Sequence, residues 1–431
     1  MKTKFHSIFL TLTLLGACVS ASLPSAFGQD AKFQLPATDE EVPGAGPLRR
    51  YDWFKQLWTE KRTAWSKRVQ QDQGALVFLG DSITQGWGDD LGGAFPGVKV
   101  ANRGISGDTT RGVLLRLKED VLALKPTGIV LLIGTNDLEE KAEPKVIAEN
   151  LKLILAEIKK QDAKVPVVLC QVFPSSASKQ RPADKIKEIN DLFAAAAKGD
   201  GQVTLVETWT LFADAQGDAN KDEFPDLLHP NKSGYAKWTS ALCPILATLG
   251  FVETEPDTFT PEAGFVSLFN GKDLSGWCFR DQKTLDVKEA FDGKTISSDN
   301  RYLAKNGRLI VTTPPEGRKI AQLWTTREFP KNFTLKLEFR ATPNADSGVF
   351  IRKPQLQCRD YPLAGPYKEL KKYKPQDWNE MIVVVKGGVA HCTCNGEVLE
   401  AEYKLPETGP IGLEGDRGQM EYRRIRIQEQ P

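Results

Sequence analysis

The hydrophobic pattern of the chain changes once, near residue 250, and this change constrains the fold more than any other feature. Before it, short continuous apolar runs alternate with amphipathic segments. The apolar runs are Ala75–Leu79, Val98–Ala101, Ile129–Ile133, Val165–Val172 and Val203–Val206. Continuous runs are typical of strands buried on both faces of a parallel sheet, and their alternation with helices is typical of three layers. We therefore predict an α/β three-layer sandwich with a parallel sheet over residues 73–250, after a lead-in and N-terminal helix over 29–72.

The amphipathic segments before residue 250 predict helices, because their apolar residues recur at helical spacing. The predicted helices are Arg50–Val69, Gly112–Leu124, Pro144–Gln161, Ala183–Lys198 and Pro230–Leu249. The first of them carries a stripe of large side chains, including Trp58 and Trp65, on one face. We interpret this stripe as core packing.

After the change, apolar residues recur at every second position, as in the segment 333–340. Short alternating strands with turn signals between them indicate a β-sandwich or jelly roll. The acidic, proline-containing stretch Glu253–Ala263 has little periodicity and lies between the two patterns. We predict a linker over residues 251–263 and an all-β jelly-roll domain over residues 264–431.

The N-terminus has the features of an export signal. Two lysines precede the apolar run Ile8–Leu15, and small residues follow it. This order describes a secretory signal, and the run is too short to span a bilayer. We predict a signal peptide over residues 1–28 and an exported protein: periplasmic, secreted or lipoprotein-anchored. Both soluble release and lipidation of Cys18 at a lipobox remain open, and we expect membrane association only with the lipidation.

The composition excludes some partners. The 57 Lys and Arg residues are balanced by 56 Asp and Glu residues. A nucleic-acid-binding protein normally has a basic excess, so we expect no nucleic-acid partner. The seven cysteines form no dense framework, and Cys392 and Cys394 lack a second pair or a His cluster, which favours small buried side chains over a metal or redox pair. We expect no metal and no cofactor. The oligomeric state stays undefined.

A serine follows the first apolar run at the edge where open α/β folds build their sites. Ser82 needs a base to become a nucleophile, and the chain has only three histidines. His6 lies in the predicted signal and His391 in the β-rich half, which leaves His229. Asp226 lies three residues earlier and can hold the imidazole in the required tautomer. Ser82, Asp226 and His229 are the predicted catalytic triad.

Two further strand ends carry groups that can stabilise a tetrahedral oxyanion. Gly104 follows the second apolar run and permits a close backbone approach. Asn136 follows the third and has a side-chain amide. Acyl transfer needs such donors where negative charge develops.

These motifs resemble the four blocks of the SGNH (GDSL-like) hydrolases, in order, over about residues 73–250. The matching blocks are Gly80-Asp81-Ser82, Gly104, Gly134-x-Asn136-Asp137 and Asp226-x-x-His229. The stretch Asn102–Leu117 is most similar to the platelet-activating-factor acetylhydrolase-like branch. The resemblance implies ester hydrolysis with Ser82 as nucleophile, His229 as base and Asp226 as its orienting partner. It also implies an oxyanion hole from the backbone N–H groups of Ser82 and Gly104 and the amide of Asn136.

The second region resembles the DUF1080 or 3-keto-disaccharide hydrolase family over about residues 264–428. The matching segments are Val266–Trp277, Asp346–Arg352, Trp378–Glu380 and Gly409–Glu414. The resemblance implies a concanavalin-like jelly roll associated with sugars. The residues that we assign to a carbohydrate-binding face are Arg352, Gln357, Trp378 and Glu414, with core packing of Trp378 as the alternative. Gln355 stands where the family usually has a glutamate, which puts hydrolysis in doubt more than sugar binding.

Together these features predict an exported serine esterase that removes short acyl groups, above all acetyl, from a carbohydrate. The expected partner is an acylated carbohydrate or another small ester. One alternative is a glycan-binding or 3-keto-glycoside-cleaving protein that acts through the C-terminal domain. The other is a lipid acyl hydrolase.

Overall fold

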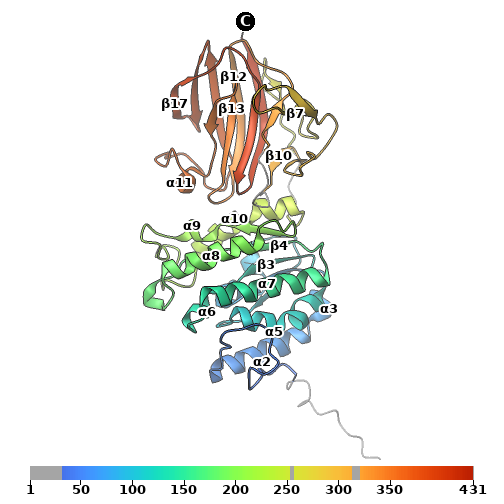
Figure 1. Cartoon of the computed structure of the whole chain (residues 1–431), viewed down its shortest axis with the longest axis vertical. Helices are drawn as coiled ribbons and strands as arrows, with labels where there is room; N and C mark the ends of the chain where they lie inside the picture. The colour runs from blue at the N-terminus through green and yellow to red at the C-terminus, as the bar shows by residue number, and fades with distance from the viewer. Residues whose placement is uncertain (1–31, 253–256, 313–320, 431) are drawn as a thin grey trace, which may run out of the picture.

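The computed structural model describes residues 32–252, 257–312 and 321–430, which form two units along the long axis of the molecule (Figure 1). The predicted signal peptide, residues 1–28, and residues 253–256 of the predicted linker lie outside the described residues. Within the described part of the chain, no helix is both long and apolar enough to cross a bilayer.

The first unit contains one five-stranded sheet in the order β2-β1-β3-β4-β5, with every neighbouring pair parallel. Its strands are β1 (Leu76–Gly80), β2 (Val100–Gly104), β3 (Gly128–Leu132), β4 (Val167–Cys170) and β5 (Val203–Val206). Its helices are α2 (Asp52–Ser66), α3 (Val69–Asp72), α4 (Ser82–Gly86), α5 (Thr110–Asp120), α6 (Thr135–Glu139), α7 (Pro144–Gln161), α8 (Ala183–Ala197), α9 (Thr208–Phe212) and α10 (Lys232–Leu249), with short 3-10 turns η1 (Leu91–Gly93), η2 (Leu122–Leu124) and η3 (Ala177–Lys179).

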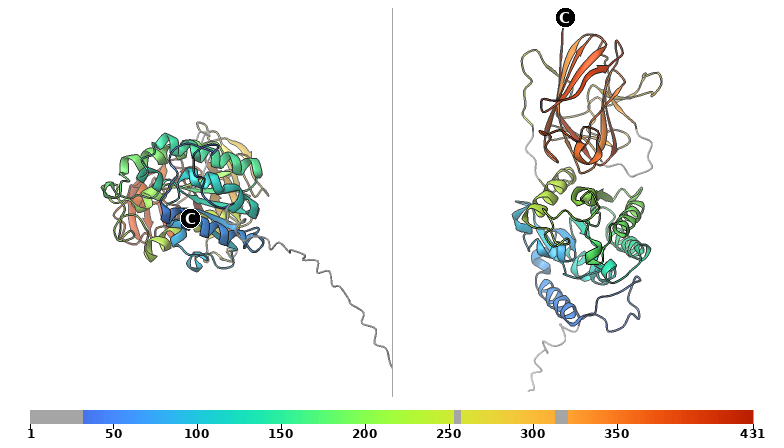
Figure 2. Two further views of the ribbon diagram at one scale, coloured as in Figure 1. Left: turned by 90° about the horizontal axis from the view of Figure 1, so that it is seen from below. Right: turned by 90° about the vertical axis from the view of Figure 1, so that its left-hand side faces the viewer.

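Both faces of this sheet are covered by helices (Figure 2). On β1, Val77 and Leu79 join the core formed with α5, α7 and α8. Leu76 and Phe78 point to the other side and join the core formed with α4 and α10. Because side chains alternate between faces and both faces are buried, the strands are apolar at every position. The prediction of a three-layer α/β sandwich with a parallel sheet is confirmed.

The segment before α2 is part of the first unit rather than a free lead-in. The Arg111 guanidinium donates to the backbone carbonyls of Val42, Pro43 and Gly46, and Asn150 forms a reciprocal pair with the Ala45 backbone. The long helix predicted over residues 50–69 is divided into α2 and α3, because the backbone between them leaves helical geometry.

The second unit is built from two antiparallel sheets. The larger has the order β17-β16-β15-β12-β19-β10-β9, with β6 beside β19, and the smaller has the order β14-β13-β18-β11-β7-β8. The strands are β6 (Val266–Ser267), β7 (Trp277–Arg280), β8 (Val287–Ala290), β9 (Tyr302–Lys305), β10 (Arg308–Val311), β11 (Leu323–Thr325), β12 (Phe333–Ala341), β13 (Asp346–Ile351), β14 (Gln355–Gln357), β15 (Asn379–Lys386), β16 (Val389–Cys394), β17 (Glu397–Lys404), β18 (Ile411–Arg417) and β19 (Met420–Glu429), with one short helix, α11 (Tyr361–Ala364).

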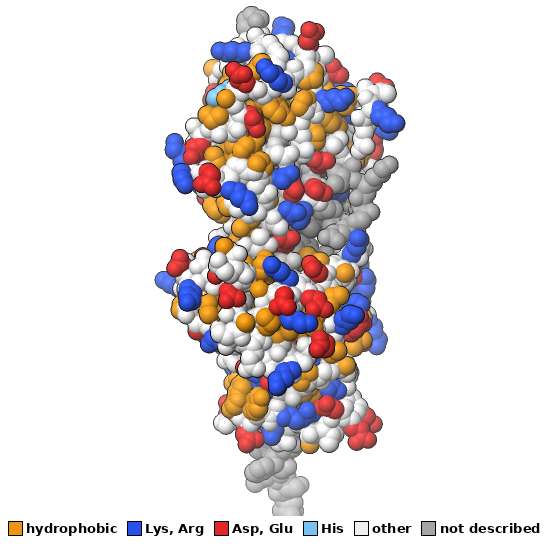
Figure 3. Space-filling model, turned by 60° about the vertical axis from the view of Figure 1, so that its left-hand side comes forward, with side chains coloured by type: hydrophobic (Ala, Val, Ile, Leu, Met, Phe, Trp, Pro, Cys, Tyr) orange, Lys and Arg blue, Asp and Glu red, His pale blue; other side chains and the backbone are white. Residues whose placement is uncertain are grey.

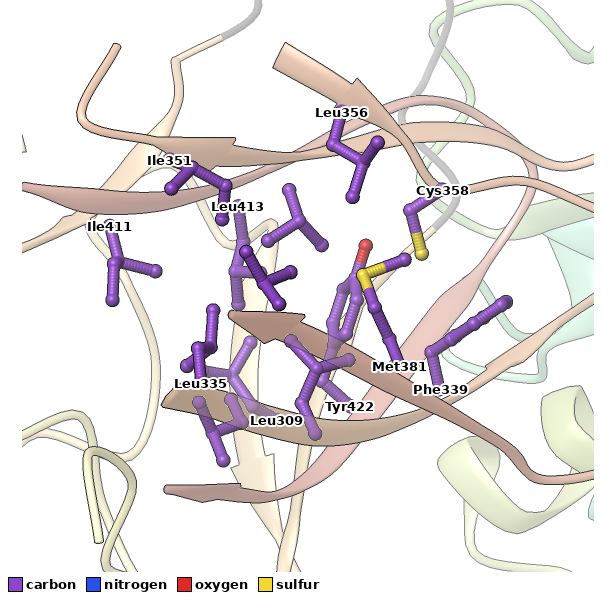
Figure 4. Close-up of a cluster of buried hydrophobic side chains, with 14 of the residues drawn as sticks. Leu309, Leu335, Phe339, Ile351, Leu356, Cys358, Met381, Ile411, Leu413 and Tyr422 are labelled. Atoms are coloured by element: carbon purple, nitrogen blue, oxygen red, sulfur yellow. The ribbon is translucent and has the colours of Figure 1, made fainter. Parts of the chain in front are cut away.

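The core of the second unit lies between its two sheets, and Figure 4 shows part of it. Leu335 and Met381 come from the large sheet, and Leu413 from the small one. Cys392 and Cys394 are buried in the same core and unpaired, as predicted for small buried side chains. An all-β sandwich consistent with a jelly roll is confirmed.

The two units meet at the C-terminal end of α10. Lys305 of the second unit donates from Nζ to the carbonyl of Thr248 at 3.0 Å and to that of Ala247 at 3.5 Å. Gln419 donates from Nε2 to the Pro244 carbonyl and to Thr248 Oγ1, both at 3.1 Å. The last carbonyls of a helix have no partners within it, and Lys305 supplies a donor to one of them, the carbonyl of Thr248.

Candidate active site

Ser82 is the first residue of α4 and lies just beyond the carboxyl end of β1. The preceding Asp81 caps this helix, since its Oδ1 accepts a hydrogen bond from the Ile83 backbone at 2.9 Å. The neighbouring strand β2 ends at Gly104, where a Cβ atom would lie only 2.3 Å from the Gln85 nitrogen. Glycine therefore allows the end of β2 to approach the backbone of α4 closely at this point.

The structure brings Ser82, His229 and Asp226 into one chain of hydrogen bonds. His229 Nε2 lies 3.0 Å from Ser82 Oγ, and His229 Nδ1 lies 2.8 Å from Asp226 Oδ2. Ser82 and His229 are 147 positions apart in the sequence. About two-fifths to one-half of the side chains of His229 and Asp226 remain exposed, so a substrate can reach them.

The loop before α10 fixes the relation between Asp226 and His229. Asp226 Oδ1 accepts from the backbone N–H groups of Leu228 at 3.0 Å and His229 at 2.7 Å. Leu227 between them has a left-handed φ of 63°, which is uncommon for a residue other than glycine. Partial burial acts to raise the pKa of Asp226, but the hydrogen bonds from His229 and Leu228 outweigh it and hold this pKa below its usual range.

The three predicted oxyanion donors differ in their partners. The Gly104 backbone N–H donates to Asn102 Oδ1 at 2.8 Å. Asn136 Nδ2 donates to the Asp108 carbonyl at 3.0 Å, and an amide nitrogen carries two hydrogens, so this bond uses one of them. The backbone N–H of Ser82 lies at the start of α4, where helices leave N–H groups without an intrahelical acceptor.

Sequence reasoning missed two polar side chains that organise this site. Asn102 donates from Nδ2 to the carbonyls of Thr84 at 2.6 Å and Gly88 at 2.8 Å, and so ties the end of β2 to the segment around α4. It stands two residues before Gly104, and that position was the available signal. Arg181 is buried and donates to Asn136 Oδ1 at 2.9 Å. No motif marks it, because its role depends on a loop that returns to the sheet edge.

Three fully buried carboxyl groups lie beneath the site. Burial raises the pKa of Asp81 to about 6 and that of Asp108 to about 6, in the second case against the opposing effect of Arg116 at 2.8 Å. Burial also raises the pKa of Asp137 to about 7, although this carboxyl group accepts hydrogen bonds from the backbone and hydroxyl groups of Thr110. These groups hold the loops after β2 and β3 together from below.

The structure does not bring the four predicted carbohydrate-binding residues to one face. Arg352 is buried, and its guanidinium donates to four backbone carbonyls of the same domain. The acceptors are Phe329, Lys331, Gly387 and Pro406. Trp378 lies against the large sheet, stacked on Arg423 at 4.0 Å and Arg340 at 4.9 Å, so it does not join residues of the small sheet.

Gln357 and Glu414 share the outer face of the small sheet. Their strand neighbours Leu356 and Leu413 enter the core, so both polar side chains point away from it. They lie on either side of Gly348 in the sheet register. Gln355 crosses this glycine and donates to Glu414 Oε2 at 2.7 Å, while Gln322 donates to Glu414 Oε1 at 3.1 Å. Burial raises the pKa of Glu414 above its usual range.

The fold defines a class of architecture: a three-layer α/β domain with a parallel sheet joined to an all-β sandwich. Residues 78–237 match the GDSL-like lipase/acylhydrolase family, and residues 264–428 match the 3-keto-alpha-glucoside-1,2-lyase-like domain. The chain therefore combines a GDSL-like acylhydrolase domain, which is a carboxylic ester hydrolase domain, with a 3-keto-disaccharide hydrolase-like domain.

Individual proteins resemble the first domain. Platelet-activating factor acetylhydrolase IB subunit alpha2 of Homo sapiens is 27% identical over 187 residues, covering 42% of this chain and 79% of that protein. Subunit alpha1 of Rattus norvegicus is 27% identical over 181 residues, covering 40% and 75%. The solved structure of a GDSL-like lipase from Bacteroides thetaiotaomicron covers 45% of this chain and 97% of that chain, with 24% identity and a TM-score of 0.39.

Proposed function

We propose that this protein is an exported serine esterase that removes short acyl groups, above all acetyl groups, from a carbohydrate. The observation that carries the proposal is the unbroken hydrogen-bond chain from Ser82 Oγ through His229 to Asp226. In this arrangement Ser82 is the nucleophile, His229 the general base, and Asp226 the group that holds the imidazole in the required tautomer.

The reaction follows from these positions. Ser82 Oγ attacks the ester carbonyl carbon while His229 Nε2 takes its proton, and the carbonyl oxygen becomes an oxyanion. The backbone N–H of Ser82 and the second Nδ2 hydrogen of Asn136 stabilise that oxyanion. The Gly104 N–H joins them when it leaves Asn102 Oδ1, its acceptor in the structure. His229 then protonates the departing alcohol. Water, activated by the same imidazole, attacks the acyl-enzyme and releases the acid together with free Ser82.

Two observations support a short acyl group and a sugar. The first domain is similar to proteins named as acetylhydrolases, and the second matches a domain described by its action on a glucoside. Glu414 and Gln357 on the small sheet are the remaining candidates for sugar contacts. For export, the proposal rests on the predicted signal over residues 1–28, with membrane attachment only through a lipidated Cys18.

A panel of esters assayed with the whole chain tests this proposal. The panel contains acetylated oligosaccharides, short- and long-chain aryl esters, and a phospholipid with an acetyl group. Wild-type protein should cleave the acetyl esters fastest, and Ser82→Ala should lose this activity while keeping the wild-type thermal transition. Near-full activity of Ser82→Ala would exclude the triad. A strict preference for the phospholipid would favour a lipid acyl hydrolase instead.

The second domain offers a separate candidate activity, the cleavage of a 3-keto-glycoside. The observation in its favour is Glu414, a carboxyl group with a raised pKa held between two glutamine amides. An amide cannot serve as an acid or base, so Glu414 rather than Gln355 would have to move the proton. This second activity would be established by two results. The Ser82→Ala variant should still release sugar from a 3-keto-glycoside, and the Glu414→Gln variant should not.

A further inference from the structure

Arg181 is a buried cation directly behind the oxyanion donor Asn136. Its side chain is 3% exposed. The residue before it, Gln180, has a left-handed φ of 60°, and this turn directs the chain between η3 and α8 back toward the sheet edge. Nη2 of Arg181 then donates to Asn136 Oδ1 at 2.9 Å and to Glu139 Oε2 at 2.8 Å.

This contact decides which way the Asn136 amide points. A guanidinium group has only donors, so the atom it faces must be the amide oxygen, and the amide nitrogen must lie on the other side. There Nδ2 spends one hydrogen on the Asp108 carbonyl. Its second hydrogen can donate to a substrate oxygen, whereas the flipped amide would present an acceptor to the oxyanion.

We propose that Arg181 is a positioning residue of the esterase, which fixes the Asn136 amide with its N–H toward the oxyanion and strengthens that donor through the adjacent positive charge. The inference rests on the proposed function and deepens it. A cation on the oxygen side of an amide draws electrons away from its nitrogen, so the N–H becomes a better donor to a developing negative charge. The oxyanion should benefit more than the neutral ester carbonyl, and the effect should therefore appear in kcat.

A purely structural role would predict something different. Arg181 also donates to the carbonyls of Thr135 at 3.1 Å and Lys179 at 2.5 Å, and so braces the start of α6. If bracing were its only role, its loss would lower stability and disturb binding and turnover together. Arg49 provides a matched control, because it too is buried and pairs with Glu139 Oε2, yet it has no contact with Asn136 in the described residues.

The experiment compares Arg181→Met, Arg181→Lys, Asn136→Ala and the double variant Arg181→Met/Asn136→Ala with Arg49→Met. The substrate is the acetyl ester cleaved best by wild type, and each protein's thermal transition is recorded. Loss of one oxyanion donor lowers kcat by roughly 10²–10³-fold, which we expect for Asn136→Ala. Arg181→Met should lower kcat by about 10- to 30-fold, a fraction of that loss, with KM almost unchanged. Arg181→Lys should recover part of kcat.

The double variant decides the question. If Arg181 acts through Asn136, the double variant should be no slower than Asn136→Ala, because the group being positioned is already gone. Multiplicative losses in the double variant, an effect on KM alone, or an equal loss in Arg49→Met would each overturn the inference. If Ser82→Ala were active, the proposed function itself would fail, whereas a silent Arg181→Met with an inactive Ser82→Ala would refute only the role of Arg181.

Discussion

The two domains differ in what became of their predicted sites. In the first domain Ser82, His229 and Asp226, chosen from separate motifs, lie in one hydrogen-bond chain. In the second domain the four chosen residues are divided among the interior, the large sheet and the outer face of the small sheet.

The difference follows from the geometry of the two kinds of sheet. In a parallel sheet all strands end at the same edge, so polar motifs that follow successive strands converge there. In an antiparallel sandwich neighbouring strands run in opposite directions, and each residue faces either the core or the outside according to the register. A motif there identifies a strand without identifying the face on which its side chains lie.

The strongest test of this contrast uses the two described histidines. His229→Ala should lower kcat for ester cleavage by roughly 10⁴–10⁶-fold, as removal of a triad base does in other serine hydrolases. His391 is exposed on β16 in the second domain, and His391→Ala should leave kcat almost unchanged. Steady-state kinetics on the same ester measures both. A comparable loss in the two variants would mean that the site does not belong to the first domain alone.

Arg352 tests whether a cation predicted to bind sugar is structural. Arg352→Met removes a buried charged donor from four backbone carbonyls, so it should lower the free energy of unfolding of the second domain by about 3 kcal/mol. Urea unfolding of the full chain measures this. The control Arg327→Met removes a half-exposed arginine paired with Glu429, and should change stability by less than about 0.5 kcal/mol. A stable Arg352→Met that has lost saccharide binding would restore the sugar-binding assignment.

The buried carboxyl groups give the first domain a pH dependence. The pKa of Asp137 is raised to about 7 in the folded state, above its unfolded value. At a pH between these two pKa values, the folded state binds more protons than the unfolded state. The contribution of Asp137 to the free energy of unfolding is therefore complete below the unfolded pKa, near 4. It falls by about 1.4 kcal/mol per pH unit as the pH rises toward 7.

The Asp137→Asn variant should lose the part of the pH dependence of the unfolding free energy that comes from this carboxyl group. The measurement is peptide-resolved hydrogen exchange of the full chain at pH 5 to 8, which separates the two domains. The exposed Asp52 provides the control Asp52→Asn. An unchanged slope in Asp137→Asn would contradict the assignment of the proton to this carboxyl group.

The smallest expected effect is on saccharide affinity, and it distinguishes the small sheet of the second domain from the large one. Glu414→Gln removes a charged acceptor from the outer face of the small sheet, and should weaken saccharide binding by about tenfold. Trp378→Ala changes the opposite sheet and should alter the affinity by less than about twofold. Calorimetric titration of each full-length variant with a saccharide that the wild-type protein binds measures the two affinities. Loss of binding in Trp378→Ala alone would move the sugar site to the large sheet.

Much of the architecture could be predicted because each pattern has a physical cause. All five apolar runs became strands of the parallel sheet, within a few residues of their predicted ends. The helix predicted over residues 112–124 became α5 followed by η2, since Val121 leaves helical geometry with φ −122° and ψ −61°. The packing of residues 33–50 on the domain could not be predicted, because its backbone is held by Arg111 and Asn150 from distant helices.

The site was predictable to the same extent. Ser82, Asp226 and His229 could be proposed from the sequence because they lie in motifs beside a strand end or a helix start, and because His229 is the one histidine of the first domain's sequence. Asn102 and Arg181 act through single contacts with carbonyl and amide oxygens, and such contacts leave no spacing in the sequence. In the second domain the site could not be predicted because the strand register is not evident from the sequence. Only the structure reveals that Gly348 lies between Gln357 and Glu414.

The charged side chains of both domains are mixed in sign over the face shown in Figure 3, so this face carries no large patch of one charge. Within the described residues, specific hydrogen bonds join the two domains. Asn344 of the second domain hydrogen-bonds Glu207 just after β5, and Lys305 and Gln419 hold the end of α10.

Helix α10 begins three residues after His229 and is completed at its far end by a lysine from the other domain. A cation near helix carbonyls is worth about 0.3–1 kcal/mol, so the fused module has become part of the hydrolase's own secondary structure. Chimeras that exchange the sugar-associated module for another will keep this stabilisation only if the new module presents a basic side chain where Lys305 now stands.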